Sequence, residues 1–156
     1  MCNFLSGIVM RNGDLLWNPY TDSHEDLIAL NNLRDTREGA FVRVEFSPPS
    51  TEDLAKPATY KLKVDQDTRP AWFTPARLDK AADKMRSIVK RMIVDRPVVG
   101  LCGGSYILAA GANVSWVKAV RIIAVCDSAR IGRVFDSARI ESVCGSARIV
   151  QDLRVK

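Results

Sequence analysis

The chain has 156 residues, of which 47% are hydrophobic and 26% charged, and its formal net charge is +5 at pH 7. These values are typical of a folded protein with one ordinary domain, or with one small domain joined to a repeat array. The sequence contains neither an apolar run near the roughly 20 residues that cross a bilayer nor a signal-peptide pattern at its amino terminus, so we expect a cytoplasmic protein without membrane contact.

The first expected element is a β-hairpin over residues 3–17. Two apolar runs flank Asn12-Gly13, a dipeptide that readily adopts the positive φ angles of a type I′ turn. Residues 22–25 then have the form of a helix capping box. We therefore expect a helix over about residues 23–33 that buries Leu27, Ile28 and Leu30.

Two strands and a long helix follow. Residues 41–46 alternate between apolar and polar side chains, which predicts a half-buried strand, and residues 60–64 are expected to be its antiparallel partner. Thr74 and Pro75 open an amphipathic helix that is expected to continue to about Val94. The second face of this helix is basic and includes Lys80, Lys84, Lys90 and Arg91. Residues 1–96 are expected to form an α+β domain with the approximate order ββαββα.

The carboxy-terminal third of the chain repeats with a period of nine. In four successive segments between residues 118 and 153, an arginine is followed by an isoleucine, and a valine comes three residues later except in the last segment, which has Asp152. β-Branched residues favour strands, whereas Asp, Gly and Ser favour tight corners. The period therefore predicts a parallel β-solenoid over residues 97–156. Two segments per turn are favoured because Cys126 and Cys144, eighteen residues apart, then stack with Phe135 on the opposite side.

The recurring arginines are the most specific feature of the sequence. They are Arg121, Arg130, Arg139 and Arg148, with Arg133 between two of them. Because the following isoleucine points inward, Arg130, Arg139 and Arg148 are expected to face solvent or a partner. Stacked guanidinium groups repel one another unless an anion intervenes, so two interpretations stay open. Either Asp127, Asp136 and Glu141 neutralise the row locally, or the row binds an anionic partner such as a nucleic acid, a nucleotide or an acidic protein.

Candidate catalytic residues are few. Cys2 becomes an amino-terminal nucleophile if Met1 is removed. His24 lies beside carboxylates and could act as a general base, although a lone histidine in the first turn of a helix is more often a surface residue. Gly103-Gly104-Ser105 lacks the lysine of a phosphate-binding loop and is expected to be a solenoid corner.

The spacing of the metal-ligating residue types argues against a metal centre. The chain has one histidine and four cysteines, at positions 2, 102, 126 and 144, with no CxxC or Cys/His spacing. We therefore expect free buried thiols, no metal and no cofactor.

A short domain that opens Met-Cys-Asn-Phe, followed by Asp/Gly-Ser-Ala-Arg-Ile repeats, resembles uncharacterised small proteins of bacteriophages and bacterial mobile elements. The resemblance implies an origin in which small binding proteins that modulate host machinery are common. The leading hypothesis is a non-enzymatic binding protein for an anionic partner. The alternatives are a small hydrolase or transferase that uses Cys2 and His24, and a structural module that forms a homo-oligomer through its solenoid.

Overall fold

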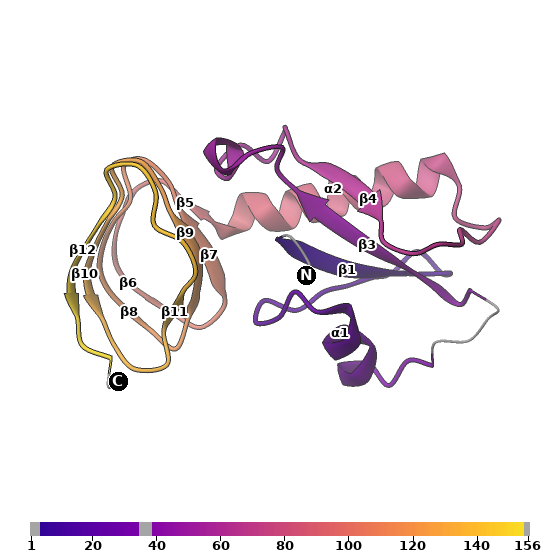
Figure 1. Cartoon of the computed structure of the whole chain (residues 1–156), viewed down its shortest axis with the longest axis horizontal. Coiled ribbons are helices and arrows are strands. Elements are labelled where there is room, and N and C mark those ends of the chain that lie inside the picture. Colours follow the sequence, from indigo (N-terminus) through magenta and orange to yellow (C-terminus); the bar gives the residue numbers. More distant parts are fainter. Residues whose placement is uncertain (1–3, 35–38, 155–156) are drawn as a thin grey trace. The chain divides into compact units, whose positions relative to one another are not determined.

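The computed structural model describes residues 4–34 and 39–154. The chain divides into two compact units, Met1–Val89 and Lys90–Lys156, and both are drawn in Figure 1. The division comes earlier than the boundary after residue 96 that the sequence suggested. It does so because the first solenoid strand, β5 (Ile93–Val94), already pairs with β7 (Ser105–Leu108).

The first unit contains a four-stranded antiparallel sheet with the strand order β2-β1-β3-β4. The strands are β1 (Leu5–Met10), β2 (Leu15–Leu16), β3 (Phe41–Ser47) and β4 (Lys61–Val64). β3 and β4 pair as their alternation predicted, with Phe46 opposite Leu62 and with Lys61 and Lys63 exposed. A short 3₁₀ turn, η1 (Thr51–Asp53), lies in the loop between them.

The hairpin between β1 and β2 forms where it was expected, but its turn is not of type I′. That turn requires positive φ at both central residues. Gly13 has a φ of 93°, whereas Asn12 is absent from the residues with positive φ. The Gly13 amide donates to the Met10 carbonyl at 2.9 Å, and the Met10 amide donates to the Asp14 carbonyl at 2.8 Å. The connection is therefore a three-residue loop in which glycine alone takes the left-handed position.

Helix α1 (His24–Leu30) is shorter than the predicted helix. The Ser23 hydroxyl caps it by accepting the amide of the third helical residue at 3.1 Å. The helix ends at Asn31, whose side-chain amide donates to the Leu27 carbonyl at 2.8 Å. Leu27 is buried and Ile28 half-buried, but Leu30 is 62% exposed. The prediction for Leu30 was wrong because the helix gives way to Asn31 at this point and no further turn covers the side chain.

The two helices pack on opposite faces of the sheet. Leu27 of α1 joins a cluster with Ile8 and Phe41. Ala81 of helix α2 (Pro75–Met92) joins a second cluster, with Val9, Val42, Val44 and Phe73. Adjacent residues of a strand point to opposite faces, so the neighbours Ile8 and Val9 place the two clusters on either side. α2 begins at Pro75 as predicted but ends at Met92, because the next two residues form β5 instead.

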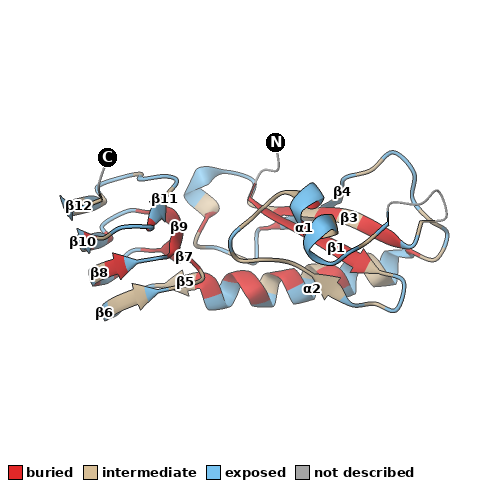
Figure 2. Cartoon of the chain, turned by 90° about the horizontal axis from the view of Figure 1, so that it is seen from below, coloured by how far each residue is buried: buried red, intermediate tan, exposed pale blue. Residues whose placement is uncertain are grey.

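The second unit is a parallel β-solenoid of about four turns over residues 93–152. Each turn supplies one strand to each of two sheets, whose orders are β12-β10-β8-β6 and β11-β9-β7-β5. Figures 1 and 2 show the stacked turns from two directions. The remaining strands are β6 (Pro97–Cys102), β8 (Asn113–Lys118), β9 (Arg121–Val125), β10 (Arg130–Val134), β11 (Arg139–Ile140) and β12 (Arg148–Asp152).

The last turns repeat every eighteen residues, as the cysteine spacing predicted. Ile131 of β10 pairs with Ile149 of β12. The sulfur atoms of Cys126 and Cys144 lie 3.4 Å apart on neighbouring turns. Earlier turns are shorter, since Ile131 pairs on its other side with Val114. Because these earlier turns contain fewer residues, their sequences do not follow the eighteen-residue repeat.

Apolar side chains from both sheets fill the solenoid. The isoleucine and valine of the repeat are fully buried at Ile122, Val125, Ile131 and Val134. Val143 breaks the pattern and is 48% exposed. It pairs with Val125 through an isolated bridge, since β11 ends at Ile140.

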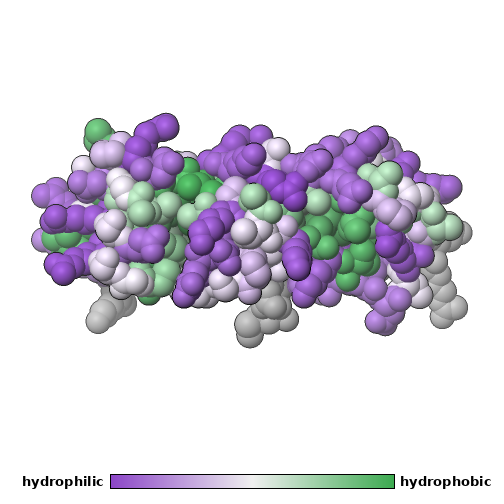
Figure 3. Space-filling model, turned by 90° about the horizontal axis from the view of Figure 1, so that it is seen from above, coloured by the Kyte–Doolittle hydropathy of each residue, from purple (hydrophilic) through white to green (hydrophobic). Residues whose placement is uncertain are grey.

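Left-handed residues form the solenoid corners. Gly103 and Gly104 have φ angles of 71° and 75° between β6 and β7, so the prediction of a corner there is confirmed. Asp127, Ser137 and Gly145 take φ angles of 55°, 65° and 68° at later corners. Hydrophilic side chains cover much of the face shown in Figure 3, with separate hydrophobic patches between them.

Candidate anion-binding site on the solenoid

The four recurring arginines form two pairs on different sheets, not one row. A step of nine residues is half of an eighteen-residue turn, so successive copies alternate between the sheets. Arg121 lies opposite Arg139 on β9 and β11, and Arg130 lies opposite Arg148 on β10 and β12. The single row expected from the sequence is therefore corrected to two separate sites.

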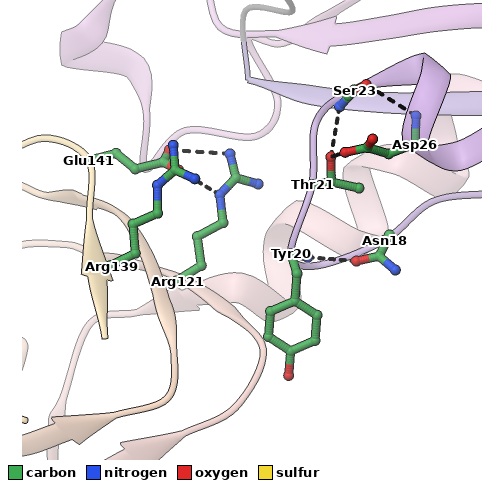
Figure 4. A network of polar contacts seen from close by, with 8 residues as sticks. All are labelled: Asn18, Tyr20, Thr21, Ser23, Asp26, Arg121, Arg139 and Glu141. Carbon is green, nitrogen blue, oxygen red and sulfur yellow. Dashed lines mark hydrogen bonds and ion pairs between the residues drawn. The ribbon is translucent and has the colours of Figure 1, made fainter. Parts of the chain in front are cut away.

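Both arginines of the pair on β9 and β11 face one carboxylate, that of Glu141 (Figure 4). The Arg121 Nε donates to Glu141 Oε1 at 2.7 Å, and its Nη2 donates to Oε2 at 3.2 Å. Arg139 Nε lies 3.5 Å from the same Oε1. Arg121 is only 5% exposed, so its inclusion among partner-binding residues was wrong. Of the three acids in the interpretation of local neutralisation, Glu141 is the one that joins this pair, and it offsets one of its two positive charges.

The pair on β10 and β12 differs because no acid joins it. Arg130 and Arg148 are both exposed. Within residues 4–34 and 39–154, neither side chain makes a hydrogen bond or an ion pair. Neighbouring strands lie about 4.8 Å apart, and like charges directly opposite one another destabilise a sheet. An anion bound between the two guanidinium groups removes that repulsion.

A second column of side chains, which includes an aromatic ring, runs beside this pair. Arg133 lies opposite Trp116 on β8 and opposite Gln151 on β12. Trp116 in turn lies over Gly100, where a Cβ atom would overlap the indole ring. Arg133 is exposed and Trp116 half-exposed. The sequence analysis missed this neighbourhood of arginine and aromatic ring because the shortened turns hide the alignment of Trp116 with Arg133.

The basic face of α2 separates into two parts. Lys80 and Lys84 line a pocket of the first unit, together with Arg77 from the preceding turn of the helix. Lys90 and Arg91 lie in the last turn of the helix and are exposed. Of these four residues, Lys80 and Lys84 are the ones that line the pocket.

His24 is buried and engaged through both ring nitrogens. It is 2% exposed, so the expectation of a surface residue was wrong. Its Nε2 lies 3.1 Å from the Val44 carbonyl and its Nδ1 lies 3.1 Å from Asp65 Oδ2. These contacts attach α1 to the sheet, which favours a structural role over that of a general base. Cys2, the other catalytic candidate, lies outside the described residues.

The thiols differ in their surroundings. Cys102 is exposed to solvent, which corrects the expectation of burial. Cys126 is buried and Cys144 is half-buried. Burial, followed by the contact with Cys144, raises the pKa of the Cys126 thiol to about 12. No group of three or more His, Cys, Asp or Glu side chains in the part of the chain that the structure describes is placed to hold a metal ion.

Comparison with known proteins finds no family model, no curated protein and no solved structure that matches this chain. Among the described residues, neither helix has the length and apolar character needed to cross a membrane.

Proposed function

We propose that the chain is a non-enzymatic binding protein whose solenoid holds an anionic partner between Arg130 and Arg148. One observation carries the proposal: these two arginines are opposite one another and without an acid among the described residues, whereas the equivalent pair on the other sheet is bridged by Glu141. The same fold and the same repeat thus provide one occupied site and one open site.

The second column indicates which anion to test first. Trp116 beside Arg133 offers a flat ring next to a cation. Aromatic side chains and cationic grooves together bind single-stranded nucleic acid, because bases stack while arginine neutralises phosphate. A nucleic acid or nucleotide is therefore the preferred partner, ahead of an acidic protein.

Fluorescence anisotropy with a labelled single-stranded oligonucleotide tests the proposal. Arg130→Gln combined with Arg148→Gln should weaken binding and should flatten the dependence of log K on log salt by about 0.7 for each phosphate that the variant no longer neutralises. Arg139→Gln is the matched control, because it removes an exposed repeat arginine that already faces Glu141.

The outcomes separate the alternatives. Unchanged affinity and salt slope in the double variant would remove the arginine pair from any binding role. Binding of an acidic protein such as polyglutamate, but not of the oligonucleotide, would keep the pair and change the class of partner. The Arg139→Gln control removes one positive charge and the double variant removes two, so a loss of binding free energy half as large in the control would show that net charge alone matters.

A second candidate function, self-association through the end of the solenoid, is favoured by a separate observation. Val143, Val150 and Leu153 in the last turn are 48%, 56% and 44% exposed. β11 and β12 are the outermost strands of their sheets in the described chain, so each has one unpaired edge. Exposed apolar edge strands readily pair with another chain, and a second copy stacked on this end would cover them.

Light scattering during size-exclusion chromatography tests the self-association. We expect the parent chain to form dimers that Val150→Lys converts to monomers, because a lysine on an edge strand opposes pairing. Leu30→Lys is the control, since Leu30 is an exposed leucine of the first unit. A parent chain that stays monomeric at high concentration would refute this candidate.

A further inference from the structure

The first unit contains a pocket of about 300 Å³ between the β1–β2 hairpin and helix α2. It is lined by Val9, Asn12, Gly13, Leu15, Arg77, Lys80, Ala81 and Lys84. Its volume is at the lower end of the range for small-molecule sites. The pocket belongs to a different unit from the paired arginines and has its own residues.

One side of the pocket is cationic because of helical spacing. Arg77, Lys80 and Lys84 recur at intervals of three and four residues, which places them on one face of α2. The Lys84 Nζ donates to the Gly13 carbonyl at 2.8 Å, and Arg77 donates through Nη1 to the Arg11 carbonyl. Both side chains therefore tie the hairpin turn to the helix, and each keeps further N–H donors for a ligand.

Lys80 lies between these two anchors and is used for neither. It makes no hydrogen bond or ion pair with any residue that the structure describes. The described residues that line the pocket include Arg77, Lys80 and Lys84 and no acidic side chain. The pocket therefore has an excess of positive charge, concentrated on an exposed ammonium group.

The floor of the pocket is apolar. Val9 and Ala81 are each 3% exposed and belong to the core cluster between the sheet and α2. Leu15 of β2 packs against the same cluster. Arg77 makes a cation–π contact with Trp72, and its Cζ atom lies 5.4 Å from the centroid of the Trp72 ring. A ligand in this pocket meets hydrocarbon below and ammonium or guanidinium groups at the rim.

We infer that this pocket binds a small amphipathic anion, in which one carboxylate or phosphate group is attached to a short apolar body. The anionic head group accepts from Lys80 and from the remaining donors of Lys84 and Arg77. The apolar body covers Val9, Leu15 and Ala81. A free inorganic anion leaves the floor uncovered, and a neutral apolar molecule leaves Lys80 without a partner, so neither matches the whole pocket.

Titration followed by ¹H–¹⁵N correlation spectra of the whole chain tests the inference. The probes are octanoate, octyl phosphate and 1-octanol, which share one apolar body and differ in their head groups. We expect octanoate or octyl phosphate to shift the amides of Asn12, Gly13 and Ala81, and 1-octanol to bind at least about tenfold more weakly, because a charge-assisted hydrogen bond is lost. The stronger of the two anions identifies the preferred head group.

Two variants make the test specific. Lys80→Gln should weaken binding of the anionic probe by about tenfold for the same reason. Lys90→Gln, which removes an exposed lysine of the same helix outside the pocket, should leave binding unchanged. The inference is overturned if neither anion binds, if octanol binds as well as octanoate, if the shifts lie elsewhere, or if Lys80→Gln has no effect. Arg130→Gln with Arg148→Gln should not alter this binding, so the result is independent of the proposed solenoid function.

Discussion

Replacement of Glu141 by glutamine tests the origin of the difference between the two arginine pairs. The Arg121 side chain is 6% exposed and bonds to Glu141 at 2.7 Å and 3.2 Å. Removal of one partner of a buried ion pair costs about 3–5 kcal/mol. The Glu141 side chain is 24% exposed, so water reaches the site, and glutamine keeps one acceptor oxygen. We therefore expect a loss of about 2 kcal/mol in the free energy of unfolding, somewhat below that range.

Urea denaturation followed by circular dichroism measures this loss, and alkylation of the buried Cys126 reports opening of the solenoid itself. Arg121→Met combined with Glu141→Met is the control, because replacing both partners by apolar side chains removes the uncompensated charge. We expect the double variant to be more stable than Glu141→Gln. The reasoning fails if Glu141→Gln changes stability by less than about 0.5 kcal/mol, the usual effect of a neutral surface substitution. In the anisotropy assay, Glu141→Gln should also strengthen oligonucleotide binding, because it removes the carboxylate beside the exposed Arg139.

Three further predictions concern the solenoid. Gly145→Ala should lower stability by about 1–2 kcal/mol, because Gly145 has a φ of 68° and a Cβ would lie 3.1 Å from Asp127 Cα. Ser137→Gly should instead raise stability, because Ser137 has a φ of 65°. Denaturation midpoints that shift in the same direction for both variants would contradict this prediction. Ile131→Ala should cost about 2–5 kcal/mol in thermal unfolding, because the side chain is fully buried; a loss of less than about 1 kcal/mol would mean that the core is not packed here. Since the pKa of Cys126 is raised to about 12, the folded chain holds this proton where the unfolded thiol, with a pKa of about 8.5, has lost it. The free energy of unfolding should therefore fall as pH rises from about 8.5 toward 12. In urea titrations at each pH, the free energy of unfolding of Cys126→Ala should fall less steeply than that of the parent chain.

Several parts of the fold follow from local patterns in the sequence. Alternation over residues 41–46 and 60–64 is enough to predict an antiparallel pair, because one face of each strand must be apolar. The period of nine, with cysteines eighteen residues apart, is enough to predict a parallel solenoid and the stacking of Cys126 on Cys144. Pro75 is enough to mark the start of the long helix.

Other parts depend on contacts that no local pattern contains. The 23–33 helix ended early at Asn31, and the long helix ended before Ile93, because pairing with β7 stabilises two residues as a strand instead. His24 is buried because its two ring nitrogens contact the Val44 carbonyl and the Asp65 carboxylate, and both of these residues are distant in the sequence. The pocket beside Lys80 exists only where the hairpin turn meets α2.

The arginines show most clearly what the sequence determines and what the tertiary structure decides. The sequence by itself determined that an arginine precedes an inward isoleucine in every repeat, since that depends only on spacing and on the character of the side chains. It could not distinguish Arg121 from Arg130, because the repeat makes them equivalent. The tertiary structure decided which pair has an acid: folding brings Glu141 beside Arg121 and Arg139, while Arg130 and Arg148 have none among the described residues. The electrostatic energy of a charge depends on its neighbours in space, and those neighbours are set by the stacking of the turns.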